Sequence, residues 1–386
     1  MNFQLSEEHL AVQAVAREFA QKELKPGVIE RDSKMEYPYE QIKRMGELGF
    51  MGMMVSPEYG GGGMDTLSYV LAMEEISKVD NSCSVIMSVN NSLVCWGLET
   101  FGTAEQKNKY LPKLASGEWL GSFCLSEPEA GSDATSQSTT AVDMGDHYLL
   151  NGTKNWITSG GTSKIHLVMA QTHPELGSRG INCLIVETSS PGVAIGAKED
   201  KLGIRSSDTH TIMYTDVVVP KENRIGEDGF GFKFAMKTLG GGRIGIAAQA
   251  LGIAGGAYEL ALGYSKQRTT FGKPINQHQA IAFKLADMAT EIEAAKLMVY
   301  RAAWLKDQHQ DYTAASAMAK LFASEVAMRH SVEAVQIHGG YGFVKEYHVE
   351  RLMRDAKITQ IYEGTSEVQR IVISREISND KPYLPA

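Results

Sequence analysis

His147 to Ile157 reads His-Tyr-Leu-Leu-Asn-Gly-Thr-Lys-Asn-Trp-Ile and belongs to a group of short runs rich in Val, Ile, Thr and Tyr. Gly, Pro, Asn and Ser separate these runs, which is typical of strands joined by turns. The pattern begins after Gly121 and is closed by Pro220. It predicts a small antiparallel sheet domain whose other strands are Ile165 to Gln171, Ile181 to Glu187, Val193 to Ala197 and Thr209 to Val219.

Helical patterns precede the sheet. Ser6 can cap a first helix that ends at Pro26, because apolar residues recur there at three- and four-residue spacing. Tyr39 to Leu48 and Leu67 to Val79 repeat this spacing. We therefore expect an N-terminal helical domain.

Longer helices are predicted after the sheet, from Phe230 onward. They are expected at Arg243 to Gln267, Gln277 to Gln308 and Tyr312 to Ile337. A chain of 386 residues exceeds what one hydrophobic core usually supports. We expect an α+β multidomain protein divided into residues 1–120, 121–229 and 230–386, with a polar surface tail at Ser378 to Ala386.

The composition argues against several kinds of partner. The net charge is −8 and no basic stripe offsets it, which disfavours nucleic acid. The N-terminus lacks the basic start and apolar core of a signal peptide, so we expect a cytoplasmic protein. No HExxH and no CxxC pair occur, so we expect no metal site and a reducing compartment for Cys83, Cys95, Cys124 and Cys183.

The uncharged stretch Ile244 to Tyr258 is too short to span a membrane. Gly252 and Gly256 stand four residues apart and would let another helix pack closely. The stretch therefore predicts a buried helix, without membrane insertion.

A lone carboxylate, Glu363, stands out in Ile361 to Arg370, which reads Ile-Tyr-Glu-Gly-Thr-Ser-Glu-Val-Gln-Arg. It lies between an aromatic residue and a glycine, just before a predicted helix start at which Ser366 and Gln369 have the spacing of a capping box. A helix N-terminus favours an anionic ligand. Glu363 is therefore either a base held against a substrate or an exposed glutamate before an ordinary helix, and the spacing alone leaves both open.

Two loops beside the sheet carry groups that can bind a flat or anionic ligand. Leu125 to Asp133 reads Leu-Ser-Glu-Pro-Glu-Ala-Gly-Ser-Asp, and its hydroxyls and backbone N–H groups can bind a ring edge or a phosphate. In Asn155 to Gly161, the indole of Trp156 can cover one face of a cofactor. A surface turn and a core tryptophan at a strand end explain the same patterns equally well.

Two further motifs lie among the C-terminal helices. Gln267 to Lys273 joins two helices, and its Arg268 can grip a pyrophosphate or simply be solvated. Gln336 to Gly342 ends a helix with three glycines, either as a C-cap or as room for a ligand. Gly240 to Gly245 matches GxGxxG, but a helical pattern precedes it where a dinucleotide site needs a strand, so we reject that site.

Taken in this order and at these separations, the motifs resemble those of the acyl-CoA dehydrogenase family over Leu5 to Arg375. Ser84 to Leu93 and Gly242 to Ala247 are most similar to the short-chain (butyryl-CoA) dehydrogenases. The resemblance implies an N-terminal helical domain, a middle β domain and a C-terminal four-helix bundle, assembled as a homotetramer. It also implies FAD between the β domain and the bundle.

The resemblance assigns roles to individual residues. Glu363 is the implied catalytic base, and Ser132, Arg243, Tyr362 and Gly364 match positions near the acyl-CoA. The isoalloxazine and ribityl part of FAD would be held by Phe123, Leu125, Ser126, Gly131, Ser132, Trp156, Ile157, Thr158, Thr365 and Glu367. The adenine and pyrophosphate end of an FAD bound mainly to a neighbouring subunit would be reached by Arg268, Phe271, Gln279, Gln336, Gly339 and Gly340.

The implied reaction is α,β-dehydrogenation of a short-chain acyl-CoA, of the butyryl-CoA to crotonyl-CoA type. Glu363 would remove the α-proton while the β-hydrogen leaves as hydride to flavin N5, and an electron-transferring flavoprotein would accept the electrons. An α C–H is a weak acid, so the developing enolate needs donors on the thioester oxygen. Burial should raise the pKa of Glu363 toward the working pH.

Two positions near Arg243 refine this reading. Some branches of the family take the base from the residue before this arginine, which is Gly242 here, so Glu363 remains the sole candidate. Gly240 stands where relatives often carry an aspartate that can bond the CoA arm, which leaves the pantetheine contacts open. An acyl-CoA oxidase, an enoyl-CoA reductase and a non-catalytic CoA-binding protein on the same fold are the alternatives.

Overall fold

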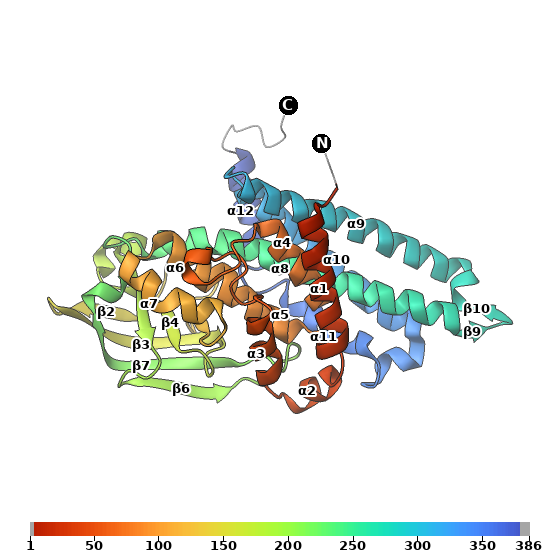
Figure 1. Ribbon diagram of the computed structural model, residues 1–386, viewed down its shortest axis with the longest axis horizontal. Coiled ribbons are helices and arrows are strands. Elements are labelled where there is room, and N and C mark those ends of the chain that lie inside the picture. Colours follow the sequence, from red (N-terminus) through yellow and green to blue (C-terminus); the bar gives the residue numbers. More distant parts are fainter. Residues whose placement is uncertain (1–3, 379–386) are drawn as a thin grey trace.

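The computed structural model describes residues 4–378, so the expected tail beyond Ser378 lies outside the described residues. Figure 1 shows the sheet at one end of the molecule, the N-terminal helices in the middle, and long C-terminal helices extending away from the sheet.

The N-terminal helices follow the predicted pattern. Ser6 caps the first helix and accepts a hydrogen bond from the His9 N–H, as predicted. This helix passes into a π-helical segment, Ala20–Leu24, before the chain turns at Pro26. A second π-helical segment, Val89–Cys95, joins α5 to α6. The α-helices are α1 (Glu7–Phe19), α2 (Val28–Lys34), α3 (Tyr39–Glu47), α4 (Thr66–Ser77), α5 (Asn81–Ser88), α6 (Trp96–Phe101) and α7 (Ala104–Ala115).

The sheet has the strand order β6-β7-β3-β2-β4-β5-β8, with β1 pairing β4. The five predicted strands are confirmed as β3 (His147–Thr158), β4 (Ile165–Gln171), β5 (Ile181–Glu187), β6 (Val193–Lys198) and β7 (Thr209–Pro220). The other strands are too short for a period to be visible: β1 (Gly121–Cys124), β2 (Thr140–Asp143) and β8 (Arg224–Ile225). The pairing is mostly antiparallel, but β1 and β2 pair with β4 in parallel.

The C-terminal region contains α8 (Gly231–Gln267), a hairpin of β9 (Thr269–Thr270) and β10 (Lys273–Pro274), α9 (Gln279–Asp307), α10 (Thr313–His338), α11 (His348–Ile358) and α12 (Ser366–Ser378). α10 packs against α8, α9, α11 and α12. The GxGxxG-like stretch lies inside α8, which confirms that it is not a dinucleotide loop. The sequence pattern missed α11. Short 3-10 turns occur at Pro57–Tyr59, Pro174–Gly180, Lys221–Asn223, Ile275–Gln277 and Gly339–Phe343.

The centre of α8 is buried, as predicted. A side chain at Gly252 would place its Cβ 2.5 Å from Ser77 Cβ, and one at Gly256 would lie 3.0 Å from Lys78 Cα, so both glycines allow α4 to approach. Within residues 4–378, α8 is the one helix long and apolar enough to cross a membrane, and 78% of its most apolar window is buried inside the protein.

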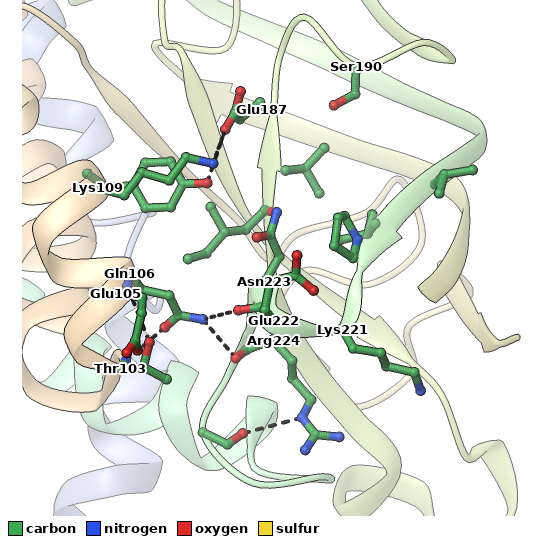
Figure 2. Close-up of a pocket in the computed structure, with 17 residues that line it drawn as sticks. Thr103, Glu105, Gln106, Lys109, Glu187, Ser190, Lys221, Glu222, Asn223 and Arg224 are labelled. Atoms are coloured by element: carbon green, nitrogen blue, oxygen red, sulfur yellow. Dashed lines mark hydrogen bonds and ion pairs between the residues drawn. The ribbon is translucent and has the colours of Figure 1, made fainter. Parts of the chain in front are cut away.

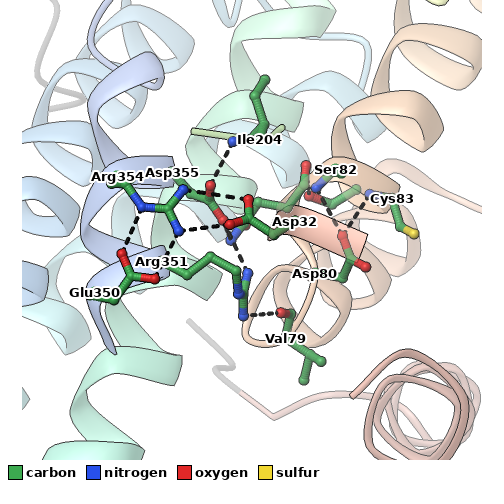
Figure 3. A network of polar contacts seen from close by, with 12 residues as sticks. Asp32, Val79, Asp80, Ser82, Cys83, Ile204, Glu350, Arg351, Arg354 and Asp355 are labelled. Atoms are coloured by element: carbon green, nitrogen blue, oxygen red, sulfur yellow. Dashed lines mark hydrogen bonds and ion pairs between the residues drawn. The ribbon is translucent and has the colours of Figure 1, made fainter. Parts of the chain in front are cut away.

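A buried polar network connects α11 to distant segments (Figure 3). The Asp355 carboxylate accepts hydrogen bonds from the Ile204 N–H at 2.6 Å, from Asn81 Nδ2 at 3.1 Å and from Arg351 Nη1 at 3.1 Å. These partners come from the loop before β7, from the start of α5 and from α11 itself. The network therefore fixes α11, whose end leads directly into the turn that carries Glu363.

Candidate active site

A pocket of about 450 Å³ lies between the sheet region and the C-terminal helices. Ligand pockets are commonly of this size. Twelve of the predicted site residues line it: Phe123, Leu125, Ser126, Gly131, Ser132, Trp156, Ile157, Thr158, Arg243, Tyr362, Glu363 and Gly364. Residues that are far apart in the sequence thus meet around one cavity.

Other residues lining the pocket were missed by sequence reasoning. Most of them come from α5 and the π-helical segment (Val85, Val89, Leu93), from α8 (Phe232, Met236, Leu239) and from α12 (Val368, Ile371, Val372, Arg375). The residues of α8 and α12 recur at three- and four-residue spacing, so they mark one face of each helix. That spacing does not distinguish a face turned toward a ligand from one turned toward the core.

A group of predicted cofactor residues lies elsewhere. Arg268, Phe271, Gln279, Gln336, Gly339 and Gly340 are exposed and do not line the pocket. Figure 1 places the β9–β10 hairpin at the far end of the long helices, away from the sheet. The Arg268 guanidinium lies over the Tyr341 ring, 5.8 Å from its centroid, so the two C-terminal motifs are neighbours. Their predicted contact with the cofactor of another subunit stays a prediction.

The start of α12 differs from the predicted capping box. Thr365 is the cap, and its Oγ1 accepts a hydrogen bond from the N–H three residues on at 3.3 Å. Ser366 is already helical, and its Oγ is buried without a partner among the described residues. Gln369 Nε2 instead donates to the carbonyl oxygens of Glu363 at 3.1 Å and Gly364 at 2.9 Å. The predicted cap at Ser366 was therefore wrong by one position. Thr365 and the exposed Glu367, which were predicted to hold the cofactor, do not line the pocket.

The turn that carries Glu363 has an unusual backbone. Glu363 has φ +53° and Gly364 has φ +93°, so a residue with a side chain occupies the left-handed region. Within residues 4–378, the Glu363 N–H makes no hydrogen bond. The amide is therefore free to donate to a bound carbonyl.

Helices on both sides hold this turn in place. From α10, Lys320 Nζ donates to the Gly364 carbonyl at 2.7 Å. From α8, Gln249 Oε1 accepts a hydrogen bond from the Tyr362 hydroxyl. Gln249 Nε2 in turn donates to Ser84 Oγ at 2.9 Å, so α5 is part of the same arrangement. The turn is thus anchored to the core on either side of the carboxylate.

The Glu363 carboxylate is poorly solvated. Its Oε2 is buried and has no hydrogen-bond partner among the described residues. Burial raises the pKa of Glu363 to about 7, although the positive charges of Lys320 and Arg243 oppose that increase. A carboxyl with a pKa of about 7 is partly ionised at neutral pH, and its ionised form can accept a proton.

Gly242 of α8 makes room for this carboxylate. An ideal Cβ at Gly242 would lie 2.7 Å from Leu93 Cδ2 and 3.0 Å from Glu363 Cδ, and closer still to Glu363 Oε2. Any side chain at this position would therefore displace either the carboxylate or the wall of the pocket.

The sheet side of the pocket is fixed by a buried ion pair. Lys154 Nζ contacts Glu127 Oε1 at 2.7 Å and donates to the Leu125 carbonyl at 3.0 Å. The same carboxylate accepts from the Ser138 N–H at 2.6 Å. Trp156 lies two residues after Lys154 with φ +62° and is 60% exposed. Its indole therefore presents a flat aromatic surface at the pocket.

A larger cavity, of about 810 Å³, lies between α7 and strands β5, β7 and β8 (Figure 2). It contains none of the predicted site residues. Two of its charged residues, Lys109 and Glu187, form an ion pair with each other at 2.8 Å. Gln106 Nε2 donates to the carbonyls of Glu222 and Arg224. The smaller pocket is therefore the candidate active site.

Comparison with known proteins gives the family. The models of the acyl-CoA dehydrogenase N-terminal, middle and C-terminal domains match residues 6–118, 122–217 and 229–378. A short-chain specific acyl-CoA dehydrogenase of Clostridium acetobutylicum is 50% identical to this chain, over 98% of the chain and 100% of that protein.

Two solved structures are similar over the whole fold. The butyryl-CoA dehydrogenase of Megasphaera elsdenii has a TM-score of 0.97 and 48% identity, covering 98% of this chain and 100% of that one. A chain in a structure described as the electron transferring flavoprotein of Acidaminococcus fermentans, in relation to flavin-based electron bifurcation, has a TM-score of 0.97, 51% identity and the same coverage. The chain therefore belongs to the acyl-CoA dehydrogenase family, whose members are flavin-dependent oxidoreductases.

Proposed function

We propose that this protein is an FAD-dependent dehydrogenase of short-chain acyl-CoA thioesters, with Glu363 as the catalytic base. The observation that carries the proposal is the buried Oε2 of Glu363, a residue that lines the pocket; this atom has no hydrogen-bond partner within residues 4–378. Its pKa of about 7 suits a base that must be ionised before the reaction and protonated after it. The short-chain preference is supported by the relatives described above.

The residues of the pocket fit a flavin. The exposed indole of Trp156 offers a face for a planar ring, and Ser126 and Thr158 offer hydroxyls beside it. A Cβ at Gly131 would meet nothing within 4 Å, so the loop leaves open space for a ligand. When bound, FAD supplies the acceptor that takes the β-hydrogen as hydride at N5.

The residues of the chain itself account for the proton transfer. The Glu363 carboxylate takes the proton from the α-carbon, and the electron pair of that C–H bond moves toward the thioester oxygen. The free Glu363 N–H can donate to this oxygen, which stabilises the negative charge that develops there. Val89, Leu93 and Phe232 line the same pocket and give it apolar walls.

Partners and organisation belong to the same proposal. Electrons would pass to an electron-transferring flavoprotein, which the similarity to the Acidaminococcus-associated chain supports. The exposure of Arg268 and Phe271, far from the pocket, supports a homotetramer in which they contact the cofactor of another subunit. The matched ranges support domains at residues 1–120, 121–229 and 230–386.

The test is an anaerobic titration of the purified yellow protein with acyl-CoAs of four to twelve carbons. Butyryl-CoA should bleach the flavin of the wild-type protein. In Glu363→Gln the flavin should stay bound and coloured, with the rate of reduction lower by roughly 10²–10⁴-fold. Glu105→Gln, the same change on the exposed surface of α7, should react as wild type.

Reduction of the Glu363→Gln flavin at the wild-type rate would remove Glu363 from its role. Failure of every acyl-CoA to bleach the wild-type flavin would contradict the proposed function and favour a non-catalytic CoA-binding protein. Rapid peroxide formation in air without a protein acceptor would instead favour an oxidase.

A further inference from the structure

We propose that Lys320 of α10 is a positioning residue for Glu363, which holds the turn beneath the carboxylate and places a buried positive charge behind it at neutral pH. This role rests on the proposed function, because it matters only where Glu363 is the base. Lys320 belongs to none of the sequence motifs and does not line the pocket.

The burial of Lys320 calls for an explanation. Its side chain is completely buried, in a helix whose neighbouring buried residues include Ala317, Ala319 and Ala323. Placing an ammonium group away from water is unfavourable unless charged or polar groups compensate. Within residues 4–378, the one hydrogen bond of Nζ that the structure contains goes to the Gly364 carbonyl. The lysine therefore serves the Glu363 turn rather than a surface ion pair.

The hydrogen bond alone does not account for a lysine at this position. The Gly364 carbonyl already accepts a second hydrogen bond, from Gln369 Nε2 at 2.9 Å. A neutral side chain at position 320 would therefore leave this carbonyl satisfied. The contribution that a neutral side chain at position 320 could not make is the positive charge.

Several charged and titratable groups surround the carboxylate. The cations are Lys320 behind the turn and Arg243, which lines the pocket. The phenols of Tyr69 on α4 and Tyr362 on the turn complete the near surroundings. The acidic groups that act on Lys320 are Glu363 itself, Glu367 on α12 and Glu325 on α10. Lys320 lies outside the pocket, so an entering ligand does not contact it directly.

This charge has a consequence for the proton transfer. Exclusion of water by a bound acyl chain favours the neutral carboxylic acid and would raise the pKa of Glu363 further. A cation behind the turn opposes that increase, since it stabilises the carboxylate. Lys320 thus keeps Glu363 ionised in the substrate complex, so that it can accept the α-proton.

The test replaces Lys320 with methionine, which has a similar shape and no charge. The ascending limb of the kcat against pH profile should move up by roughly one pH unit, since an opposite charge nearby shifts a carboxyl by that order. At pH 7 the rate should fall about fivefold and recover at about pH 9, because the base is then almost fully ionised. Lys320→Gln should show the same shift, which keeps the test available if the methionine variant does not fold.

Lys306→Met is the matched control. Lys306 of α9 is also a lysine whose pKa burial lowers to about 8, as it does that of Lys320. Its Nζ lies 5.2 Å from the centroid of the Trp96 ring and is not among the charges that act on Glu363. Its pH profile should match that of the wild type.

A second readout separates proton transfer from oxidation. An acyl-CoA with sulfur in place of the β-carbon cannot lose hydride, so the exchange of its α-protons in D₂O reports the base alone. The exchange should show the same pH shift in Lys320→Met. Unchanged profiles in both assays, in a variant that is folded and binds flavin, would overturn the positioning role. A wild-type protein that neither exchanges these protons nor bleaches contradicts the proposed function itself.

Discussion

The substitution Gly242→Ala tests whether activity depends on the position of the Glu363 carboxylate. In an α-helix, alanine is more favourable than glycine by about 0.5–1 kcal/mol, so the variant should gain local helix stability. However, its Cβ would lie 3.0 Å from Glu363 Cδ and 2.7 Å from Leu93 Cδ2. The carboxylate must therefore move away, while the helix that pushes it becomes more stable.

The expected loss of activity follows from that displacement. Restoring an ordinary contact requires the carboxylate to move by about 1 Å, and a misplacement of that size can lower a rate by about 10²-fold. Two neighbours in α8 provide controls. A Cβ at Gly240 would lie 3.5 Å from Tyr312 Cε2, and one at Gly241 would lie 3.4 Å from Lys306 Nζ, both ordinary contacts.

The assay is kcat for butyryl-CoA beside the thermal melting temperature. Gly240→Ala and Gly241→Ala should raise the melting temperature slightly and keep their activity. Gly242→Ala should lose about 10²-fold in kcat with flavin still bound. Wild-type turnover in Gly242→Ala would show that the clash is relieved without moving the base, and the argument from this glycine would fail.

Three further outcomes are expected. Wild-type kcat should rise with pH as Glu363 ionises, with a midpoint of about 7. Because the pKa of this carboxyl is raised in the folded protein, the free energy of unfolding should fall as pH rises from 4.5 to about 7. Denaturation of Glu363→Gln should lack this dependence on pH. Arg268→Ala should weaken flavin retention or oligomer assembly on gel filtration, and unchanged flavin content would count against contact with a pyrophosphate. Asp355→Ala should lower the free energy of unfolding by about 3–5 kcal/mol, because Arg351 then lies buried without its partner; a loss below 1 kcal/mol, measured by urea denaturation, would contradict this.

The strands were predictable where a run was long enough to show its composition. β4 and β5 have the predicted bounds, because Ile165 to Gln171 and Ile181 to Glu187 are mostly apolar and end at polar turns. β2 and β8 have four and two residues, which is too few for a period. α11 was missed because its buried face includes the charged residues Arg351 and Asp355, which interrupt the apolar pattern of a helix. Only the structure shows that they pair with each other in the interior.

Sequence motifs predicted many of the residues of the pocket, but they did not predict how these residues are arranged in space. Glu363, Trp156 and Ser132 were found because each stands in a local pattern of aromatic, hydroxyl and glycine residues. Lys320 was missed because a lysine among alanines in a helix is usually a solvated residue, and only the fold shows that it is buried. The one-residue error at the start of α12 arose because Thr365 and Ser366 are both good caps.

Glu363 has a left-handed backbone and a carboxylate oxygen without a partner in the described part of the chain, so the features that serve activity here oppose stability. A glycine at this position would relax the strain and remove a poorly solvated charge, so an inactive variant should accumulate at least as well as the native protein. Selection for expression level or heat resistance would favour such a variant, and only an assay that counts turnovers would eliminate it.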